Sequence, residues 1–249
     1  DYQPQNGNRK GTKNMTAKEK AEGISSKKTQ EKYKQQKPAI LREKATRILQ
    51  LLEIRYPHPE THLTHKDAWE LLVATVLAAQ CTDERVNKVT PALFARWPGP
   101  LDLAEATQED LESVIRPTGF YHNKATHLLA AAKRIRDVYD GRVPECMADL
   151  VTLPGVARKT ANVVLFGAFG RNEGLAVDTH VGRIAWRMGL ASGRDPIKTE
   201  KELMALFPRE EWGNVNHRLV WFGRHVCTAR SPQCHKCEMM EFCERRELP

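Results

Sequence analysis

The chain has 249 residues and a formal net charge of +8, and 41% of its residues are hydrophobic. This length allows one large domain or two small ones, and the most apolar run, residues 71–79, is too short to cross a bilayer. Because no stretch resembles a signal peptide, we expect a soluble, cytoplasmic protein without a membrane span.

The positive charge is concentrated at the N-terminus. Residues 1–38 hold ten of the 39 Lys and Arg residues and four of the 31 Asp and Glu residues, a net charge of +6. This stretch has almost no apolar side chains to bury, so we expect a flexible basic arm that adds salt-sensitive affinity for polyanions. An inert solubilising tail fits the same composition.

From about residue 40 the composition becomes globular, and apolar residues recur at helical spacing. Asp83 and Asn123 are placed to act as N-caps. No stretch alternates with a period of two, so the predicted fold class is all-α. Helices are predicted over residues 40–56, 65–79, 83–94, 101–104, 108–115, 124–139, 147–153, 179–189, 199–207 and 215–226, and after the turn described next.

Residues 153–165 read LPGVARKTANVVL, and Pro154 with Gly155 is a tight-turn signal before a helix. The backbone amides after such a turn, together with the positive end of the helix dipole, suit a phosphate. Lys159 lies in the first helical turn, where the dipole opposes its charge and favours the neutral, nucleophilic amine. Taken alone, the stretch also fits a plain turn, a capped helix and a solvated lysine.

Asp178 lies in the sequence AVDTH, nineteen residues after Lys159 and just before a predicted helix. Asp is a favoured N-cap residue, which gives it a structural role. Its carboxylate is also suited to move protons or to stabilise a developing cation if it lies near Lys159. One residue can do both.

The chain has six cysteines, and four of them lie within seventeen residues at the C-terminus. This clustering is not typical of a disulfide framework, whereas four thiolates separated by turns can converge on one soft metal centre. Ligand type alone allows zinc or a [4Fe–4S] cluster. The remaining two, Cys81 and Cys146, are expected to be reduced thiols. The four candidate ligands are Cys227, Cys234, Cys237 and Cys243.

These three motifs, in this order, resemble those of endonuclease III, an iron–sulfur DNA glycosylase of the helix–hairpin–helix superfamily. The resemblance covers about residues 40–246. It implies a monomeric enzyme of the bacterial cytoplasm that removes oxidised pyrimidines, such as thymine glycol, from double-stranded DNA. The same enzyme would then cleave the strand at the abasic site by β-elimination. The resemblance also implies that the metal centre is a [4Fe–4S] cluster.

The resemblance assigns catalytic and DNA-contacting roles to five side chains. It implies that Lys159 forms the Schiff base and that Asp178 is the catalytic carboxylate. Gln80 and Phe120 would fill the gap that an extruded base leaves in the duplex. His180 would line the pocket that receives this base.

The hairpin supplies a further set of implied DNA contacts. By resemblance, the amides of Gly155, Val156 and Ala157 hold a phosphate near the lesion. The family's second hairpin glycine is replaced by Ala157, which would be strained if the backbone there required a positive φ. Some members carry an acidic residue where Val151 stands. Asp83 matches a structural or pocket carboxylate.

The resemblance further implies two helical lobes with a DNA groove between them. The first spans residues 61–171 and carries the hairpin, and the second combines residues 40–60 with 172–249 and carries the cluster. Two alternatives are a monofunctional mismatch glycosylase of the same superfamily, which Lys159 disfavours, and a non-catalytic iron–sulfur protein that binds DNA lesions. The latter would not need both Lys159 and Asp178.

Overall fold

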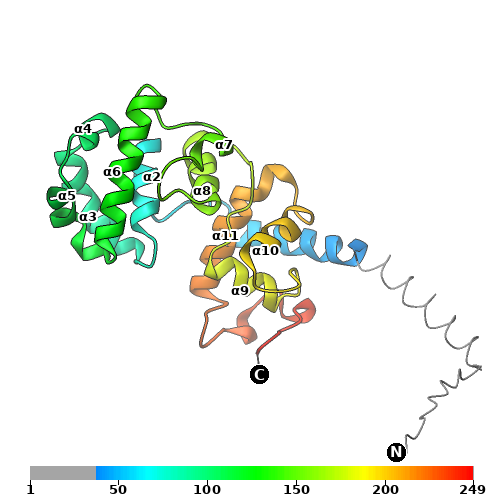
Figure 1. Cartoon of the computed structure of the whole chain (residues 1–249). Coiled ribbons are helices and arrows are strands. Elements are labelled where there is room, and N and C mark those ends of the chain that lie inside the picture. The colour runs from blue at the N-terminus through cyan, green and yellow to red at the C-terminus, as the bar shows by residue number, and fades with distance from the viewer. Residues whose placement is uncertain (1–37, 249) are drawn as a thin grey trace, which may run out of the picture. The chain divides into compact units, whose positions relative to one another are not determined.

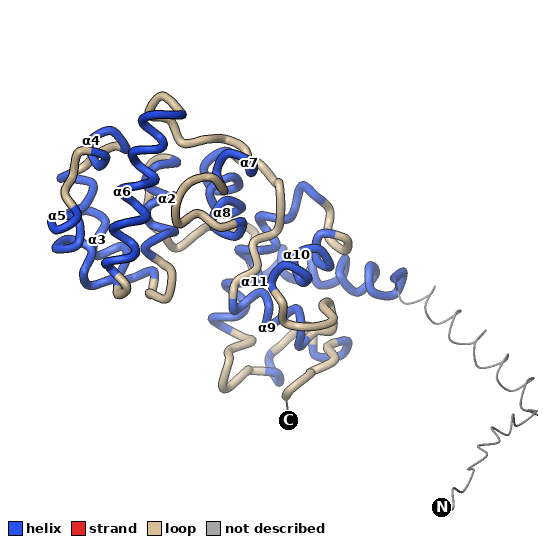
Figure 2. The backbone as a smooth tube through the Cα atoms, in the orientation of Figure 1, coloured by secondary structure: helices blue, strands red, loops and turns tan. Residues whose placement is uncertain are grey.

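The computed structural model describes residues 38–248, and throughout this range the chain forms helices, turns and loops without a strand (Figure 2). The all-α prediction is therefore confirmed. The predicted basic arm over residues 1–38 lies, apart from Pro38, outside the described residues. Lys44–Pro249 forms one compact unit. No helix in the described range is both long and apolar enough to span a bilayer.

The helices follow in the order of the colours in Figure 1, and a first helix covers residues 38–55. The later α-helices are α2 (Ala68–Leu77), α3 (Asp83–Arg96), α4 (Pro100–Ala104), α5 (Gln108–Ile115), α6 (Tyr121–Val138), α7 (Met147–Leu150), α8 (Arg158–Phe169), α9 (Thr179–Arg187), α10 (Pro196–Met204) and α11 (Trp212–His225). The short 3₁₀ helices are η1 (Arg116–Thr118), η2 (Arg209–Glu211), η3 (Cys234–Lys236) and η4 (Met240–Phe242).

Two of the predicted N-cap residues, Asp83 and Asn123, are wrong. Helix α3 is capped by Thr82, whose Oγ1 accepts from Arg85 N at 3.3 Å, and Asp83 is already the first helical residue. Helix α6 begins before Asn123, and its N-cap is Phe120 in the left-handed conformation without a side-chain cap. In α3 the hydroxyl of Thr82, one residue earlier, forms the cap in place of Asp83. In α6 the left-handed backbone at Phe120 starts the helix three residues before Asn123.

The largest group of buried apolar side chains runs from Leu63 to Leu165 and surrounds α2. Helix α2 packs against α8 and α6, and α4 and α5 pack against α6. Leu71, Leu72 and Leu77 of α2 are at most 1% exposed, and each such burial contributes about 1.5–3 kcal/mol. A helix covered on most sides needs apolar residues all round, which explains why α2 is the most hydrophobic stretch of the chain.

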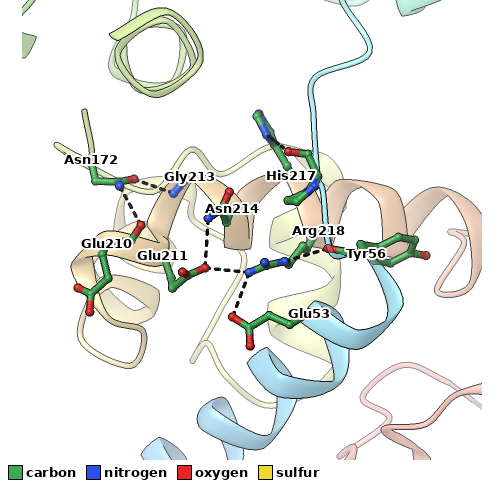
Figure 3. Close-up of polar contacts among 10 residues, drawn as sticks. Glu53, Tyr56, Asn172, Glu210, Glu211, Gly213, Asn214, His217 and Arg218 are labelled. Carbon is green, nitrogen blue, oxygen red and sulfur yellow. Dashed lines mark hydrogen bonds and ion pairs between the residues drawn. The ribbon is translucent and has the colours of Figure 1, made fainter. Parts of the chain in front are cut away.

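A buried arginine of α11 joins this helix to the end of the first helix (Figure 3). Arg218 Nη1 donates to Glu211 Oε2 at 2.8 Å and to Glu53 Oε1 at 3.4 Å, and its Nε donates to Tyr56 O at 3.2 Å. The side chain of Arg218 is only 6% exposed. Since it has both carboxylate and carbonyl partners, its burial leaves no uncompensated charge at this junction.

Candidate active site and metal centre

One cavity of about 630 Å³ brings together residues that lie far apart in the sequence. Lys159 enters from the start of α8, Asp178 and His180 from the start of α9, and Gln80 from the turn after α2. Ala157, the N-cap of α8, also lines this cavity. The predicted nucleophile, the predicted carboxylate and two predicted DNA contacts therefore share one site.

The turn before α8 has the geometry of an anion-binding hairpin. Gly155 has φ +79°, and a Cβ built there would lie 2.8 Å from Cβ of His127, so this position requires glycine. Ala157 has φ −84° and no side-chain cap, which leaves the first amides of α8 without a side-chain acceptor. Because its φ is negative, Ala157 carries none of the strain that a left-handed backbone would impose. Lys159 follows two residues later and is exposed.

The three amides predicted to bind phosphate are not equivalent. Val156 is buried, and its N–H donates to Leu153 O at 3.1 Å within the turn. Within the described residues, Gly155 N and Ala157 N donate to no other protein atom. The predicted phosphate contact therefore fits Gly155 and Ala157, whereas the Val156 amide already has an acceptor.

Asp178 is the N-cap of α9, as its residue type predicted. Its Oδ1 accepts from Val181 N at 2.8 Å, and its Oδ2 has no hydrogen-bond partner among the described residues. Ala176 and Val177, which precede it, are buried and hold the chain in place. One oxygen thus fixes the carboxylate, and the other remains for a substrate.

The orientation of His180 follows from its neighbour Arg183. Arg183 Nη2 donates to His180 Nδ1 at 3.1 Å, and since a guanidinium only donates, the neutral ring must carry its proton on Nε2. Burial lowers the pKa of His180, and the nearby Asp178 opposes this in part. A Cβ on Gly223 would lie 2.8 Å from His180 Nδ1, so a glycine of α11 makes room for the ring.

Gln80 and Phe120, the two predicted base-replacing residues, share an uncommon backbone conformation. Gln80 has φ 54° and Phe120 has φ 50°, a region that costs a residue other than glycine about 1–3 kcal/mol. Both side chains are exposed, and both line a second cavity of about 200 Å³. Gln80 borders the Lys159 cavity as well. The two turns therefore present their side chains at one place beside the candidate active site.

Sequence reasoning missed one wall of the cavity. His62 stacks on Trp221 with ring centroids 4.4 Å apart, and Trp221 Nε1 donates to Glu60 O at 2.9 Å. Beside them, Asp83 Oδ2 accepts from Arg224 Nη2 at 2.5 Å, so the predicted pocket carboxylate lies at the cavity within an ion pair. No motif signalled these contacts, because each joins α11 to a segment more than 140 residues away.

The C-terminal loop surrounds a separate, small cavity of about 20 Å³. Arg187 Nη1 donates to Cys227 Sγ at 3.5 Å, and Arg245 N donates to Cys243 Sγ at 3.4 Å. In the described chain, no three His, Cys, Asp or Glu side chains are spaced for a single metal ion. The cavity is lined by all four predicted ligands: Cys227, Cys234, Cys237 and Cys243.

The environment of these thiols suits a metal centre. Burial raises the pKa of Cys237 to about 11 and raises the pKa of Cys243. A thiol in this state stays protonated until a cation takes its sulfur as a ligand and releases the proton. Four soft sulfur donors around one cavity, with N–H groups aimed at two of them, fit an iron–sulfur cluster.

Two family profiles match the chain. The profile of the HhH-GPD superfamily of base excision DNA repair proteins matches residues 73–209, and that of the iron–sulfur binding domain of endonuclease III matches residues 227–243. The second match coincides with the four cysteines. The fold and the two cavities therefore define a DNA-binding base-excision repair enzyme of the helix–hairpin–helix class with a [4Fe–4S] cluster.

The endonuclease III of Synechocystis sp. is 48% identical over 207 residues, which cover 83% of this chain and 94% of that protein. The endonuclease III of Bacillus subtilis is 44% identical over 189 residues, with 76% and 86% covered. The chain belongs to the endonuclease III family, and it is a DNA glycosylase and abasic-site lyase. The alternative of a non-catalytic lesion-binding protein is thereby set aside.

Solved structures agree with this membership. A trapped endonuclease III–DNA covalent intermediate aligns with a TM-score of 0.79 and 41% identity over 82% of this chain and 96% of that one. A thermostable thymine-DNA glycosylase aligns with a TM-score of 0.74 over 82% of this chain and 96% of that one, but with only 22% identity. This second likeness shows the shared fold alone.

Proposed function

We propose that this chain excises oxidised pyrimidines, such as thymine glycol, with Lys159 as the nucleophile and Asp178 as the catalytic carboxylate. The observation that carries the proposal is their convergence on one cavity from two different helices. A cavity of about 630 Å³ is large enough for an extruded nucleoside. Chemistry at C1′ requires that extrusion, because the atom cannot be reached inside a stacked duplex.

The DNA contacts that we assign surround this cavity. Gln80 and Phe120 would occupy the gap left by the extruded base. The amides of Gly155 and Ala157, backed by the positive end of α8, would hold a phosphate beside it. His180 would offer its Nε2–H to an acceptor on the base.

The reaction begins when the neutral amine of Lys159 attacks C1′ and the bond from C1′ to the base breaks. The base leaves with the electron pair of that bond and takes up a proton, while the amine nitrogen loses one proton. The C1′–O4′ bond of the sugar ring then breaks as the nitrogen lone pair forms the protonated C1′=N Schiff base, and O4′ takes up a proton to become a hydroxyl. Loss of the C2′ proton then drives β-elimination of the 3′ phosphate, which breaks the C3′–O bond. Asp178 stabilises the positive charge at C1′ and accepts a proton from the lysine. Water finally hydrolyses the Schiff base and frees Lys159.

For the architecture, we propose the two lobes that the resemblance implies, residues 61–171 and residues 40–60 with 172–249. The group of buried apolar side chains supports this division, because it begins at Leu63 and ends at Leu165, within the first range. The residues assigned to the active site line one cavity within a single copy of the chain, so we propose that the protein acts as a monomer. We expect this monomer to act on DNA in the bacterial cytoplasm, as the organisms of its relatives suggest.

We assign the [4Fe–4S] cluster a structural role, in which it ties the C-terminal loop together. After Cys227, only Met239 among the apolar side chains is buried in the described residues. A loop with so small a core needs metal–thiolate bonds to hold one conformation. Once the cluster holds the C-terminal loop in one conformation, the loop would present its basic residues to the DNA backbone.

Borohydride trapping on a duplex that contains thymine glycol tests the assignment of the nucleophile. The wild type and Lys133→Ala, which removes an exposed lysine of α6, should both give a covalent protein–DNA adduct. Lys159→Ala should give none. An adduct with Lys159→Ala would move the nucleophile to another amine, and base release by the wild type without an adduct would identify water as the nucleophile.

A further inference from the structure

A buried lysine connects the two turns that carry Gln80 and Phe120. Lys124 of α6 is 5% exposed, and its Nζ donates to Leu77 O at 2.8 Å and to Thr118 O at 2.9 Å. Burial lowers the pKa of Lys124, and the only group that raises it is Cys81. No carboxylate of the described chain forms an ion pair with Lys124. A buried ammonium without a carboxylate is costly, so its two carbonyl partners must offset that cost.

Both partner carbonyls lie at the ends of helices. Leu77 is the last residue of α2, and Thr118 is the last residue of η1. Carbonyl groups in the last turn of a helix have no partner within the helix and carry the negative end of its dipole, so they favour a cation. Lys124 therefore satisfies two helix ends with one side chain.

The chain reaches the two base-replacing residues immediately after these carbonyls. Gln80 lies three residues beyond Leu77, and Phe120 lies two residues beyond Thr118. Lys124 is also tied to the second turn by its backbone, because its N–H donates to Phe120 O at 3.1 Å. The same cavity of about 200 Å³ is lined by Gln80, Phe120 and Lys124.

The left-handed backbone at Gln80 and Phe120 is a conformation that the surroundings must impose, because neither residue favours it alone. The packing of α2 and η1 against α6 brings the two turns near each other, and a hydrogen bond to each preceding helix end would fix their separation more closely. Of the contacts at this place, the ammonium of Lys124 is the one that bonds to both preceding helix ends.

We propose that Lys124 is a positioning residue that holds the Gln80 turn and the Phe120 turn at the separation needed for both side chains to enter the duplex together. This inference rests on the proposed base-replacing roles of Gln80 and Phe120. Lys124 itself is buried behind the turns and acts through them. It differs from an ordinary core residue because its loss should impair extrusion of the base more than the chemistry at C1′.

The test is a double-mutant cycle on the full, cluster-loaded chain. Lys124→Met keeps a long unbranched side chain and removes the donors. It is measured alone and in the background of Gln80→Ala with Phe120→Ala. Ile135→Val is the matched control, since Ile135 is a fully buried residue on the same helix that contacts neither turn by hydrogen bonds. Should Lys124→Met fail to fold, Lys124→Gln, which keeps a neutral donor, takes its place.

Two substrates separate positioning from stability. The first is a duplex with thymine glycol opposite 2-aminopurine, whose fluorescence reports unstacking when the lesion is extruded. The second is a single strand with an abasic site, where there is no stacked partner strand to displace, so that lyase activity does not require Gln80 and Phe120 to enter a duplex. Single-turnover rates and the fluorescence change are measured for each variant.

We expect Lys124→Met to slow excision from the duplex by about tenfold, the size of a typical coupling between neighbouring groups, and to reduce the fluorescence change. Cleavage of the single strand should stay within about twofold of the wild type, and Lys124→Met should add little in the Gln80→Ala, Phe120→Ala background. Ile135→Val should leave both substrates unaffected.

Equal losses on both substrates, or the same loss in both backgrounds, would overturn the positioning role while leaving the base-replacing roles intact. If Gln80→Ala with Phe120→Ala does not slow excision from the duplex, those roles fail, and the inference about Lys124 falls with them.

Discussion

Lys159 and Asp178 reach the same cavity from the N-terminal turns of two different helices, α8 and α9. Asp178 caps α9 with its Oδ1, whereas α8 has Ala157 as its N-cap and no side-chain acceptor. The two helix starts thus bring a carboxylate and an amine to one site, which is the pair of groups that the proposed reaction requires.

Asp178→Asn should separate the two roles of this residue. Asn caps a helix about as well as Asp, so the free energy of unfolding should change by only a few tenths of a kcal/mol. The rate of base excision should fall by about 10²–10⁴, because the amide cannot accept the proton or stabilise the cation at C1′. Urea unfolding and single-turnover excision on a thymine glycol duplex measure the two effects.

Asp178→Ala supplies the comparison. It removes the bond to Val181 N as well and should cost about 1 kcal/mol of stability in addition to activity. Near wild-type excision by Asp178→Asn would show that Asp178 is a cap alone.

Gly155→Ala should damage both stability and DNA binding. The backbone there has φ +79°, and the new Cβ would lie 2.8 Å from Cβ of His127, so the substitution should cost at least about 1–3 kcal/mol. The distorted turn would also move the amides assigned to the phosphate. Affinity for a duplex with a stable abasic-site analogue should drop, as measured by fluorescence anisotropy at fixed salt.

The matched control is Ala157→Gly in the same turn. Since Ala157 has φ −84°, glycine relieves no strain there, and stability should change by less than about 0.5 kcal/mol. A gain in affinity from Ala157→Gly would show that the alanine methyl obstructs the phosphate, contrary to the geometry of the turn.

The sequence predicted the helices and their order because periodic apolar residues and caps act locally. The Asp178 cap and the turn at Gly155 were predictable on the same grounds. Lys124 was not, because a lysine in an amphipathic helix is normally solvated, and its two acceptors lie in other elements. The stacking of His62 on Trp221 escaped prediction for the same reason, since nothing local links the two segments.

Cys237→Ser should remove the iron–sulfur cluster. Cys237 lines the C-terminal cavity with the other three cysteines, and a serine hydroxyl is a poor substitute for a thiolate as an iron ligand. The purified variant should lack the cluster's visible absorbance and bound iron, and its C-terminal loop should become sensitive to proteolysis. Cys146→Ser, which changes a cysteine outside that cavity, should keep full iron content. Unchanged iron in Cys237→Ser would refute the ligand assignment.

Arg218→Met should destabilise the junction in Figure 3 by about 2–4 kcal/mol. Arg218 is 6% exposed, and its loss leaves the Tyr56 carbonyl without this donor and Glu211 with Asn214 Nδ2 in place of a cationic partner. Arg136 provides the contrast, because its pairs with Glu105 and Asp137 lie at the surface. Arg136→Met should change stability by less than about 1 kcal/mol. Urea unfolding of both variants checks the difference, and equal effects would mean that burial of the ion pair is irrelevant here.

Stability should fall as the pH is lowered through the range in which histidine titrates. Burial lowers the pKa of His217, the Pro59 carbonyl opposes this, and His62 lowers it further. In the unfolded chain the His217 ring takes up a proton at about pH 6.5, whereas in the folded protein the same ring stays neutral to a lower pH. Between these two values the unfolded state holds more protons, so the free energy of unfolding decreases as the pH falls.

His217→Gln should flatten this dependence between about pH 7.5 and about pH 5.5, since glutamine does not titrate. His58→Gln, at an exposed position, should leave the slope as it is in the wild type. The measurement is the free energy of unfolding in urea at several pH values for the three proteins. Burial also lowers the pKa values of His62 and His180. These two residues should account for the slope that remains in His217→Gln. A His217→Gln slope identical to that of the wild type would mean that His217 takes up its proton over the same pH range in the folded and unfolded protein, contrary to the effect of burial.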